Sequence, residues 1–497
     1  MQTAVVCLLV AAIYKLLAVL LQLWNSAGKS PIFPVPDGHW LMGHILMVRH
    51  SNQERLRCFR LQRTSFVFFC LFFFQVQQDE SGMEQLIKWG KQYPYAFTVR
   101  LGPIVKFLYI HHPDYAKTFL TSSVNHGRVS FLRHTLTCHP LESSGDGLVL
   151  LDDDKWLSHR KLLNPAFRID ILKPYVKVMS QAANTMLDKL ERYSNTGESF
   201  EICEHMTAMT MDIIMNCAFC SKKKTVRSAL QELADIGCLR FRNPLYHNKL
   251  LFHLSPLGFS YRRACKGHNQ AGLTNEEVQA EVKTFMVAGH ESTSVALSFI
   301  FYTLACNPEH QKICREEVTQ VLGDKDTVDC SMIGWLWGSH FMMAIVWEDL
   351  ANMPYTTMCI KESLRLYPPV PVVSRKLTKP MTFFDGRTLP EGSLIALQVY
   401  ALHRNATVWE NPDLFDPLRF LPDNVCQRSP HAFVPFSAGL RNCIGQSFAM
   451  NEIKVVVALM LKRYQLIEDP TKKPRLLYRI VLRPKTGIHI QIKPLDA

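Results

Sequence analysis

The longest amphipathic pattern in the chain runs from Thr274 to Pro308, "TNEEVQAEVKTFMVAGHESTSVALSFIFYTLACNP". Thr274 and Glu277 have the spacing of a capping box, and Asn307 followed by Pro308 is a typical helix end. The pattern predicts one continuous helix. At the rise of an α-helix it would be about 48 Å long, the full width of a domain.

The N-terminus carries a different pattern, an almost continuous apolar run from Thr3 to Trp24. This length suffices to cross a bilayer as a helix. Lys15 would cost about 3 kcal/mol at the bilayer centre unless its amine reaches the interface. A cleaved signal peptide is the alternative, but no cation precedes the run and the run is longer than a usual signal core. We therefore predict a transmembrane signal-anchor at residues 1–27, and Lys29 after it favours a cytosolic location for the rest.

Residues 28–46 are predicted to be a linker, because Pro31, Pro34 and Pro36 cannot continue a helix and stiffen the chain. Residues 47–497 are predicted to form one catalytic body, in which helical patterns dominate.

One short region has the pattern of strands and turns instead. In "MTFFDGRTLPEGSLIALQVYAL", residues 381–402, turns are predicted at Asp385-Gly386 and at Pro390 to Gly392. The expected fold class is therefore mainly α with a small β-rich subdomain.

Composition and charge restrict the partners. The chain has 497 residues, of which 47% are apolar, and 56 basic against 43 acidic residues give a net charge of +13. No basic run is interleaved with aromatics and no zinc-finger or RNA-binding signature occurs, which argues against nucleic acid. Membrane lipids with anionic headgroups suit the diffuse positive charge better. Fifteen unpatterned cysteines indicate a reduced, cytosol-facing protein.

The middle of the long predicted helix, "AGHESTS", contains residues that a helix disfavours. Gly289 costs up to about 1 kcal/mol relative to alanine. The hydroxyls of Ser292, Thr293 and Ser294 can bond back to helix carbonyls and bend the turn. One interpretation is a flexible helix with a solvated acid at Glu291. The other is a groove for a small ligand, with an acid and a hydroxyl beside it.

Several catalytic motifs are excluded. His290 and Glu291 begin the zinc-protease pattern HExxH, but its second histidine is replaced by Ser294. No GxSxG nucleophile motif and no CxxCH for covalent haem attachment are present.

The stretch "PFSAGLRNCIGQSF", residues 435–448, places Cys443 among glycines just before a predicted helix. A buried structural thiol is the usual fate of a free cysteine. However, "FSAGLRNCIG" matches the haem-binding pattern FxxGxRxCxG of the cytochrome P-450 superfamily, and four further motifs follow the order of that superfamily. They are WxxxR at Trp156 and Arg160, the groove motif at Ala288 to Ser292, ExxR at Glu362 and Arg365, and "PLRF" at Pro417 to Phe420.

The chain thus resembles the cytochrome P-450 superfamily from Phe33 to its C-terminus. Two segments, "MPYTTMCIKESLRLYPPVP" and "ALHRN", are similar in sequence to family 4, the fatty-acid ω-hydroxylase group. The resemblance implies the cytochrome P-450 fold and haem b (iron protoporphyrin IX). Cys443 would be the metal ligand, whose thiolate donates electron density that favours O–O cleavage.

The resemblance also implies roles for other residues. The residues expected to bind the cofactor are Trp156, Arg160, Gly289, Arg375, Phe436, Gly439, Arg441 and Gly445. Those expected to relay protons are Glu291, Ser292 and Thr293. Those expected to brace the fold as a buried ion network are Glu362, Arg365 and Arg419.

The implied activity is monooxygenation of a lipophilic small molecule, a fatty acid or related lipid hydroxylated at or near its terminal methyl. No GxGxxG dinucleotide motif follows a predicted strand, so electrons are expected from a separate NADPH–cytochrome P-450 reductase, with cytochrome b5 as a further candidate donor. The expected location is the endoplasmic reticulum membrane, with the catalytic domain facing the cytosol.

Two positions depart from the pattern of the superfamily. Ser292 stands where threonine is usual, which leaves the hydroxyl less rigidly held. Ala288 stands where many family 4 members have a glutamate that can form an ester to haem, so the haem is expected to be noncovalent. The alternative functions are a haem-thiolate isomerase or peroxygenase, and a catalytically impaired membrane-anchored family member.

Three regions do not fit the usual spacing of the family. Residues 48–80 and about 329–346 are longer than expected, and several dozen residues that form helices over the substrate pocket are missing near 265–273. Incorrect exon boundaries are one explanation, and genuine lineage-specific loops are the other.

Overall fold

The computed structural model describes residues 32–37, 80–101, 105–122, 147–219, 273–323 and 345–495. The predicted anchor at 1–27 lies outside these ranges, as do the two atypical segments and the junction near 265–273, apart from a few residues at their ends. Within the described ranges, no helix combines the length and the apolar character needed to cross a membrane.

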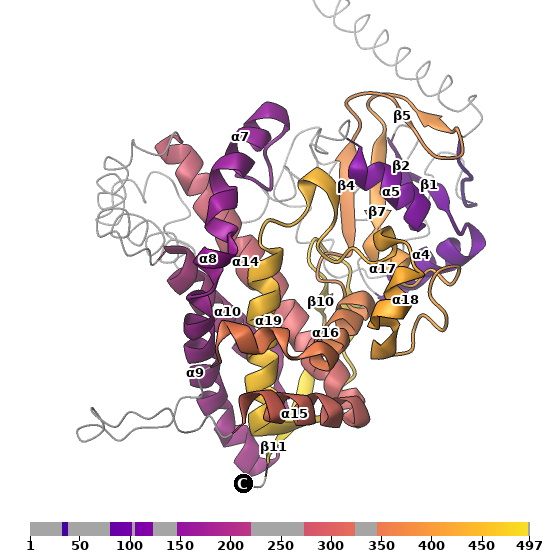
Figure 1. The fold of residues 1–497 in the computed structure, drawn as a ribbon. Coiled ribbons are helices and arrows are strands. Elements are labelled where there is room, and N and C mark those ends of the chain that lie inside the picture. The colour runs from indigo at the N-terminus through magenta and orange to yellow at the C-terminus, as the bar shows by residue number, and fades with distance from the viewer. Residues whose placement is uncertain are drawn as a thin grey trace, which may run out of the picture.

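Helices make up most of the described chain (Figure 1). The α-helices are α4 (Glu80–Gln92), α5 (Pro113–Thr121), α7 (Asp153–Leu163), α8 (Ile169–Leu172), α9 (Tyr175–Thr196), α10 (Ile202–Phe219), α14 (Asn275–Cys306), α15 (Pro308–Leu322), α16 (Pro354–Leu366), α17 (Val399–Leu402), α18 (Pro422–Cys426) and α19 (Gln446–Arg463). The 3₁₀ turns are η2 (Asn164–Phe167), η4 (Trp347–Ala351), η5 (Pro417–Phe420), η6 (Pro430–Ala432) and η7 (Gly439–Arg441).

The long helix predicted from the sequence is confirmed as α14. The Thr274 side chain accepts from the Glu277 amide at 3.2 Å, and the Glu277 carboxylate accepts from the Thr274 amide at 2.9 Å. This capping box satisfies two amides that the first helical turn leaves without partners. The helix ends at Cys306, before Pro308, which begins α15.

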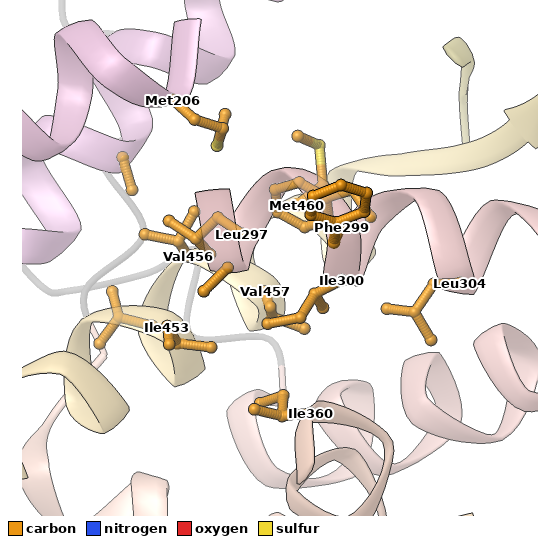
Figure 2. Close-up of a cluster of buried hydrophobic side chains, with 14 of the residues drawn as sticks. Met206, Leu297, Phe299, Ile300, Leu304, Ile360, Ile453, Val456, Val457 and Met460 are labelled. Carbon is orange, nitrogen blue, oxygen red and sulfur yellow. The ribbon is translucent and has the colours of Figure 1, made fainter. Parts of the chain in front are cut away.

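The main hydrophobic core lies where α14 crosses α19 (Figure 2). Side chains of the two helices pack together there, and helices α10 and α16 contribute one labelled side chain each. The labelled members are Met206, Leu297, Phe299, Ile300, Leu304, Ile360, Ile453, Val456, Val457 and Met460. All ten are buried, and burying a side chain of this size contributes about 1.5–3 kcal/mol. This core fixes α19, and with it the loop that precedes α19.

The strands form four small sheets beside the helices, so the predicted mainly α class with a β-rich part is confirmed. The largest sheet has the order β1-β2-β7-β4, with β2 and β7 parallel and the other pairs antiparallel. The strands are β1 (Ala96–Leu101), β2 (Val105–Ile110), β3 (Phe200–Glu201), β4 (Val372–Lys376), β5 (Met381–Thr382), β6 (Thr388–Leu389), β7 (Leu394–Gln398), β8 (Tyr464–Glu468), β9 (Leu476–Leu477), β10 (Arg483–Pro484) and β11 (His489–Pro494).

The turn predicted at Asp385-Gly386 is confirmed as the connection between β5 and β6, where Gly386 has a φ of 82°. The predicted strand region is shorter than its pattern suggests. It ends at Gln398, because Val399–Leu402 form the short helix α17, which is buried between the sheet and the helices.

Candidate active site

A tight loop carries Cys443 immediately before α19. The Cys443 amide donates to the Phe436 carbonyl at 2.9 Å and closes the loop. Gly439 has a φ of 70°, and a Cβ atom there would lie 2.0 Å from the Leu120 carbonyl oxygen at the end of α5. Only glycine can therefore occupy this position. The loop is held against α5 on one side and continues into α19 on the other.

The Cys443 thiol is exposed to solvent although protein groups surround it. Desolvation raises the pKa of the thiol, and this effect outweighs the Gly445 amide, which donates to the sulfur, and the positive charge of Arg160. A Cβ atom at Gly445 would lie 3.9 Å from the sulfur. The loop by itself thus leaves the thiol protonated, and a bound metal ion is what would convert it to the thiolate.

Arg160, on α7, holds the backbone of this loop. Its two terminal nitrogens donate to the Asn442 carbonyl and to the Asn442 side-chain oxygen, both at 2.8 Å. Its Nε donates to the Asn164 side chain at 3.0 Å. The hydrogen bonds of Arg160 thus position Asn442, the residue next to Cys443. Its predicted contact with the cofactor carboxylates stays a prediction.

Two other guanidinium groups lie close together near the loop. The Arg441 guanidinium stacks on the buried Trp156 ring at 4.1 Å, and it donates to the Leu151 carbonyl at 2.8 Å. Arg375, on β4, is 7% exposed, and its pKa is lowered to about 10, first by burial and second by the charge of Arg441.

Arg375 donates to the Phe119 carbonyl at 3.3 Å. Arg441 pairs with the Asp152 carboxylate, 3.9 Å away and 43% exposed. A planar cofactor with two carboxylates would fit such a site, because it would neutralise both guanidiniums. The exposed thiol, the Gly445 amide and this cation pair are thus all compatible with haem.

Phe436 borders a cavity of about 180 Å³. The lining residues are Lys361, Leu364, Phe433, Val434, Pro435, Phe436, Ser437, Gln446 and Met450.

The face of α14 that carries Ala288 lies toward the Cys443 loop. The rings of Phe285 and Phe167 are 5.5 Å apart, and a Cβ atom at Gly445 would lie 3.8 Å from Phe167. Residues i, i+3 and i+7 share a helix face, so Ala288 and Ser292 follow Phe285 on this side. Ala288 is exposed, and Ser292 is partly exposed.

Gly289 and Thr293 lie on the side of α14 that packs against α10. A Cβ atom at Gly289 would meet Ile214 of α10 at 3.0 Å, and Thr293, one turn later, is 3% exposed. The absent side chain of Gly289 therefore allows close packing of α14 against α10. The role beside the cofactor that the motif indicated stays a prediction. Of the two adjacent hydroxyls, Ser292 is on the accessible side, where it donates to the Ala288 carbonyl at 2.6 Å.

The third residue of the predicted proton relay, Glu291, has a partner that the sequence did not reveal. Its carboxylate accepts from Nε of Arg483 at 2.9 Å and also from a terminal nitrogen of the same guanidinium. Arg483 is separated from Glu291 by 192 residues and belongs to no motif.

Glu362, Arg365 and Arg419 are brought together beneath the loop region. Glu362 and Arg365 are fully buried and form two hydrogen bonds of 2.7 and 2.8 Å, and Arg419 lies 3.5 Å from Glu362. The remaining donors of Arg365 go to backbone carbonyls. These belong to His403, Pro412 and Leu414. The group ties α16 to the segment before α18 and contacts neither the thiol nor the groove residues.

A second buried contact, absent from the sequence interpretation, fixes α7 relative to α14. His159 Nδ1 lies 2.7 Å from the Glu281 carboxylate, whose other oxygen accepts from the Leu148 amide at 3.0 Å. Because α7 also carries Trp156 and Arg160, this contact sets their distance from the groove. In the sequence, the only sign of this contact was a histidine, His159, directly before Arg160.

An exposed cysteine in a glycine-containing loop, paired buried cations and a groove helix define the class of haem-thiolate proteins. Comparison with known proteins agrees. The Cytochrome P-450 family model matches residues 62–266 and 257–491. The chain is 37% identical to cytochrome P-450 4B1 of Rattus norvegicus, over 99% of this chain and 96% of that protein. It is 39% identical to cytochrome P-450 4A7 of Oryctolagus cuniculus, over 93% and 90%. It is also 37% identical to cytochrome P-450 4X1 of Homo sapiens, over 93% and 91%.

The chain therefore belongs to the cytochrome P-450 family, and its relatives are members of family 4. Members of this family are monooxygenases that bind haem b noncovalently, so the protein is an oxidoreductase with this cofactor. The family also implies a redox partner and a lipophilic substrate.

Proposed function

We propose that the protein hydroxylates a fatty acid or a related lipid at or near its terminal methyl. The observation that carries the proposal is the exposed Cys443 thiol, in a loop that also carries Arg441 and lies toward the face of α14 that bears Ala288 and Ser292. The similarity to family 4 supports the lipid substrate. A long acyl chain would gain about 0.8 kcal/mol for each CH₂ group that it buries.

Each part of the site has a role in this reaction. Haem, when bound, supplies the activation of O₂. Cys443 would hold its iron, Arg375 and Arg441 would bind its two carboxylates, and Arg160 would keep the loop in place through Asn442. Glu291 and Ser292 would deliver the protons that oxygen reduction consumes.

NADPH–cytochrome P-450 reductase is the proposed electron donor, with cytochrome b5 as an additional one. We place the protein at the endoplasmic reticulum membrane, anchored by residues 1–27, with the catalytic domain facing the cytosol. The apolar run from Thr3 to Trp24 supports this location.

The test combines a spectrum with turnover. Reduced protein with carbon monoxide should show the absorbance band of thiolate-ligated haem, and Cys443→Ala should lose that band because no neighbouring side chain can replace the sulfur. Laurate with reductase and NADPH should give hydroxylated product only with the wild-type protein. Product formed from peroxide but not from NADPH would favour the peroxygenase alternative. A thiolate spectrum without any turnover would favour an impaired family member.

We further propose that residues 48–80 and 329–346 and the shortened region near 265–273 reflect incorrect exon boundaries. The alignment with the rat relative spans 541 positions, more than the 497 residues of this chain, so the relative contains stretches that this chain lacks. The two parts of the family match also meet at residues 257–266. Sequencing of full-length transcripts tests this, and a dominant message that encodes the chain as it stands would contradict it.

A further inference from the structure

The ion pair between Glu291 and Arg483 connects the groove helix to a distant β-hairpin. Glu291 lies in the middle of α14, and Arg483 is the first residue of β10. Two nitrogens of the guanidinium donate to the same carboxylate oxygen, and the Nε bond measures 2.9 Å. The side chains are 21% exposed for Glu291 and 51% exposed for Arg483. The pair thus lies at a partly solvent-exposed position on α14.

The backbone of Arg483 is held rigidly. Its neighbour Leu482 is fully buried, and the Leu482 amide donates to the Pro369 carbonyl at 2.8 Å. Arg483 itself pairs with Leu477 across the β9–β10 ladder, and Pro484 restricts it to an extended conformation. A guanidinium presented from a fixed strand can hold a carboxylate in one orientation.

Within the described ranges, no other side chain forms a hydrogen bond with the Glu291 carboxylate. The Ser292 hydroxyl is committed to the Ala288 carbonyl at 2.6 Å. Glu291 and Ser292 are adjacent in the helix, so their side chains leave it about 100° apart. The orientation of the acid is therefore determined by Arg483 and not by the hydroxyl to which it would pass a proton.

We propose that Arg483 is a positioning residue for proton delivery: it holds the Glu291 carboxylate at a partly solvent-exposed position on α14. From there the carboxylate takes a proton from water, passes it toward the Ser292 hydroxyl, and returns to its ionised state. This inference rests on the proposed monooxygenase function, because only oxygen reduction requires the protons.

The first test examines the contact without turnover. Phenylglyoxal labels accessible arginines, and mass spectrometry of the holoenzyme reports the labelling of each one. Glu291→Gln should raise the labelling rate of Arg483 about two- to fivefold, the range expected for loss of a partly exposed ion pair. Arg479, an exposed arginine of the same hairpin, serves as the internal control and should not change.

The second test measures the coupling of electrons to product. Arg483→Gln should lower the hydroxylated laurate formed per NADPH about tenfold, because one misplaced proton-transfer group typically costs at least that factor. The laurate Kd should stay within about twofold of the wild-type value, because the substitution does not change how the substrate binds before the reaction. Arg483→Lys should recover part of the yield, and Arg479→Gln, which removes the same charge from the same hairpin, should behave as wild type.

The outcomes separate the possibilities. An unchanged yield per NADPH in Arg483→Gln overturns the proposal, as does unchanged labelling of Arg483 in Glu291→Gln. A higher laurate Kd with a normal yield of product per NADPH would also overturn the proposal. It would identify Arg483 as the partner of the substrate carboxylate. If labelling changes as expected but the wild-type protein forms no product, the contact stands and the proposed function fails.

Discussion

Two groups of arginines in this protein differ in what neutralises them. Arg365 is fully buried, and all three of its guanidinium nitrogens are bonded, two of them to Glu362. Arg375 is almost as buried, but it donates to a single carbonyl, and its pKa is lowered to about 10 by burial and by the neighbouring charge of Arg441.

The difference separates structure from binding. A buried charge that the protein pairs with its own carboxylate belongs to the folded architecture, and removing one partner leaves the other charge uncompensated. Two adjacent cations repel each other and raise the energy of the empty protein, and a dianionic ligand recovers that energy on binding. The first group therefore supports folding, and the second supports the cofactor.

The largest expected effect tests this contrast directly. Arg365→Met should destabilise the apoprotein by about 3–5 kcal/mol, because it strands the Glu362 carboxylate in the core. Arg375→Met should change the apoprotein by less than about 1 kcal/mol, since it removes a buried charge that repels Arg441. Urea unfolding followed by tryptophan fluorescence measures both values. Equal losses in the two variants would contradict the contrast.

The pH dependence of stability probes the first group further. His403 is fully buried, its carbonyl accepts from Arg365, and its pKa is lowered to about 3 by burial and by the charges of Arg365 and Arg404. Its folded-state pKa lies below the unfolded value, so the unfolded chain binds the proton first and stability falls as the pH decreases from about 6.5 toward 3.

Between pH 6.5 and pH 4 this histidine should account for a loss of about 3 kcal/mol, at 1.36 kcal/mol per pH unit. His403→Gln keeps an acceptor for the Val434 amide, which His403 now binds at 3.0 Å, and should flatten the stability curve in that window. A curve with unchanged slope would show that other groups control acid unfolding.

The second group can be tested with a modified cofactor. Haem with both carboxylates esterified cannot form the charged contacts. Wild-type protein should therefore bind it about 10–100-fold more weakly than haem, because the charge-assisted hydrogen bonds are lost. In the double variant Arg375→Met and Arg441→Met the preference should fall below about threefold, because no ion pair remains to be lost.

Arg428→Met is the matched control, because Arg428 also lies 4.1 Å over a tryptophan ring, that of Trp409, but the charges near it are those of Arg419, Glu362 and Arg365. It should keep the full preference for haem. If Arg428→Met also lost the preference for haem over its diester, the result of the double variant would be due to the general loss of positive charge.

The smallest effect concerns how the cofactor is retained. Acidified acetone protonates the carboxylates of haem, so all of it should be extracted from the wild-type protein, in which only noncovalent contacts hold it. Ala288→Glu places a carboxyl on the exposed position of the groove and should retain a minor fraction of haem after turnover. Haem that resists extraction from the wild-type protein would show a covalent link.

Local sequence signals predicted much of this protein. The capping box of Thr274 and Glu277 and the end before Pro308 define α14 without any tertiary contact, because a helix end is decided by the backbone groups that its own side chains satisfy. The turn at Asp385-Gly386 is equally local. The cysteine loop was recognisable because its glycines and arginine have fixed spacing within ten residues.

Only the tertiary structure decided which groups face one another. A helix turns 100° per residue, so the motif around Gly289 could not show that this glycine faces Ile214 while Ser292 lies on the accessible side. The pairing of Glu291 with Arg483 joins residues 192 positions apart, and no local pattern encodes such a contact. Likewise, Arg365 and Arg375 are both arginines in recognisable motifs. Their different roles follow from the neighbours that the fold gives them: Arg365 is paired with Glu362, whereas Arg375 lies near the charge of Arg441.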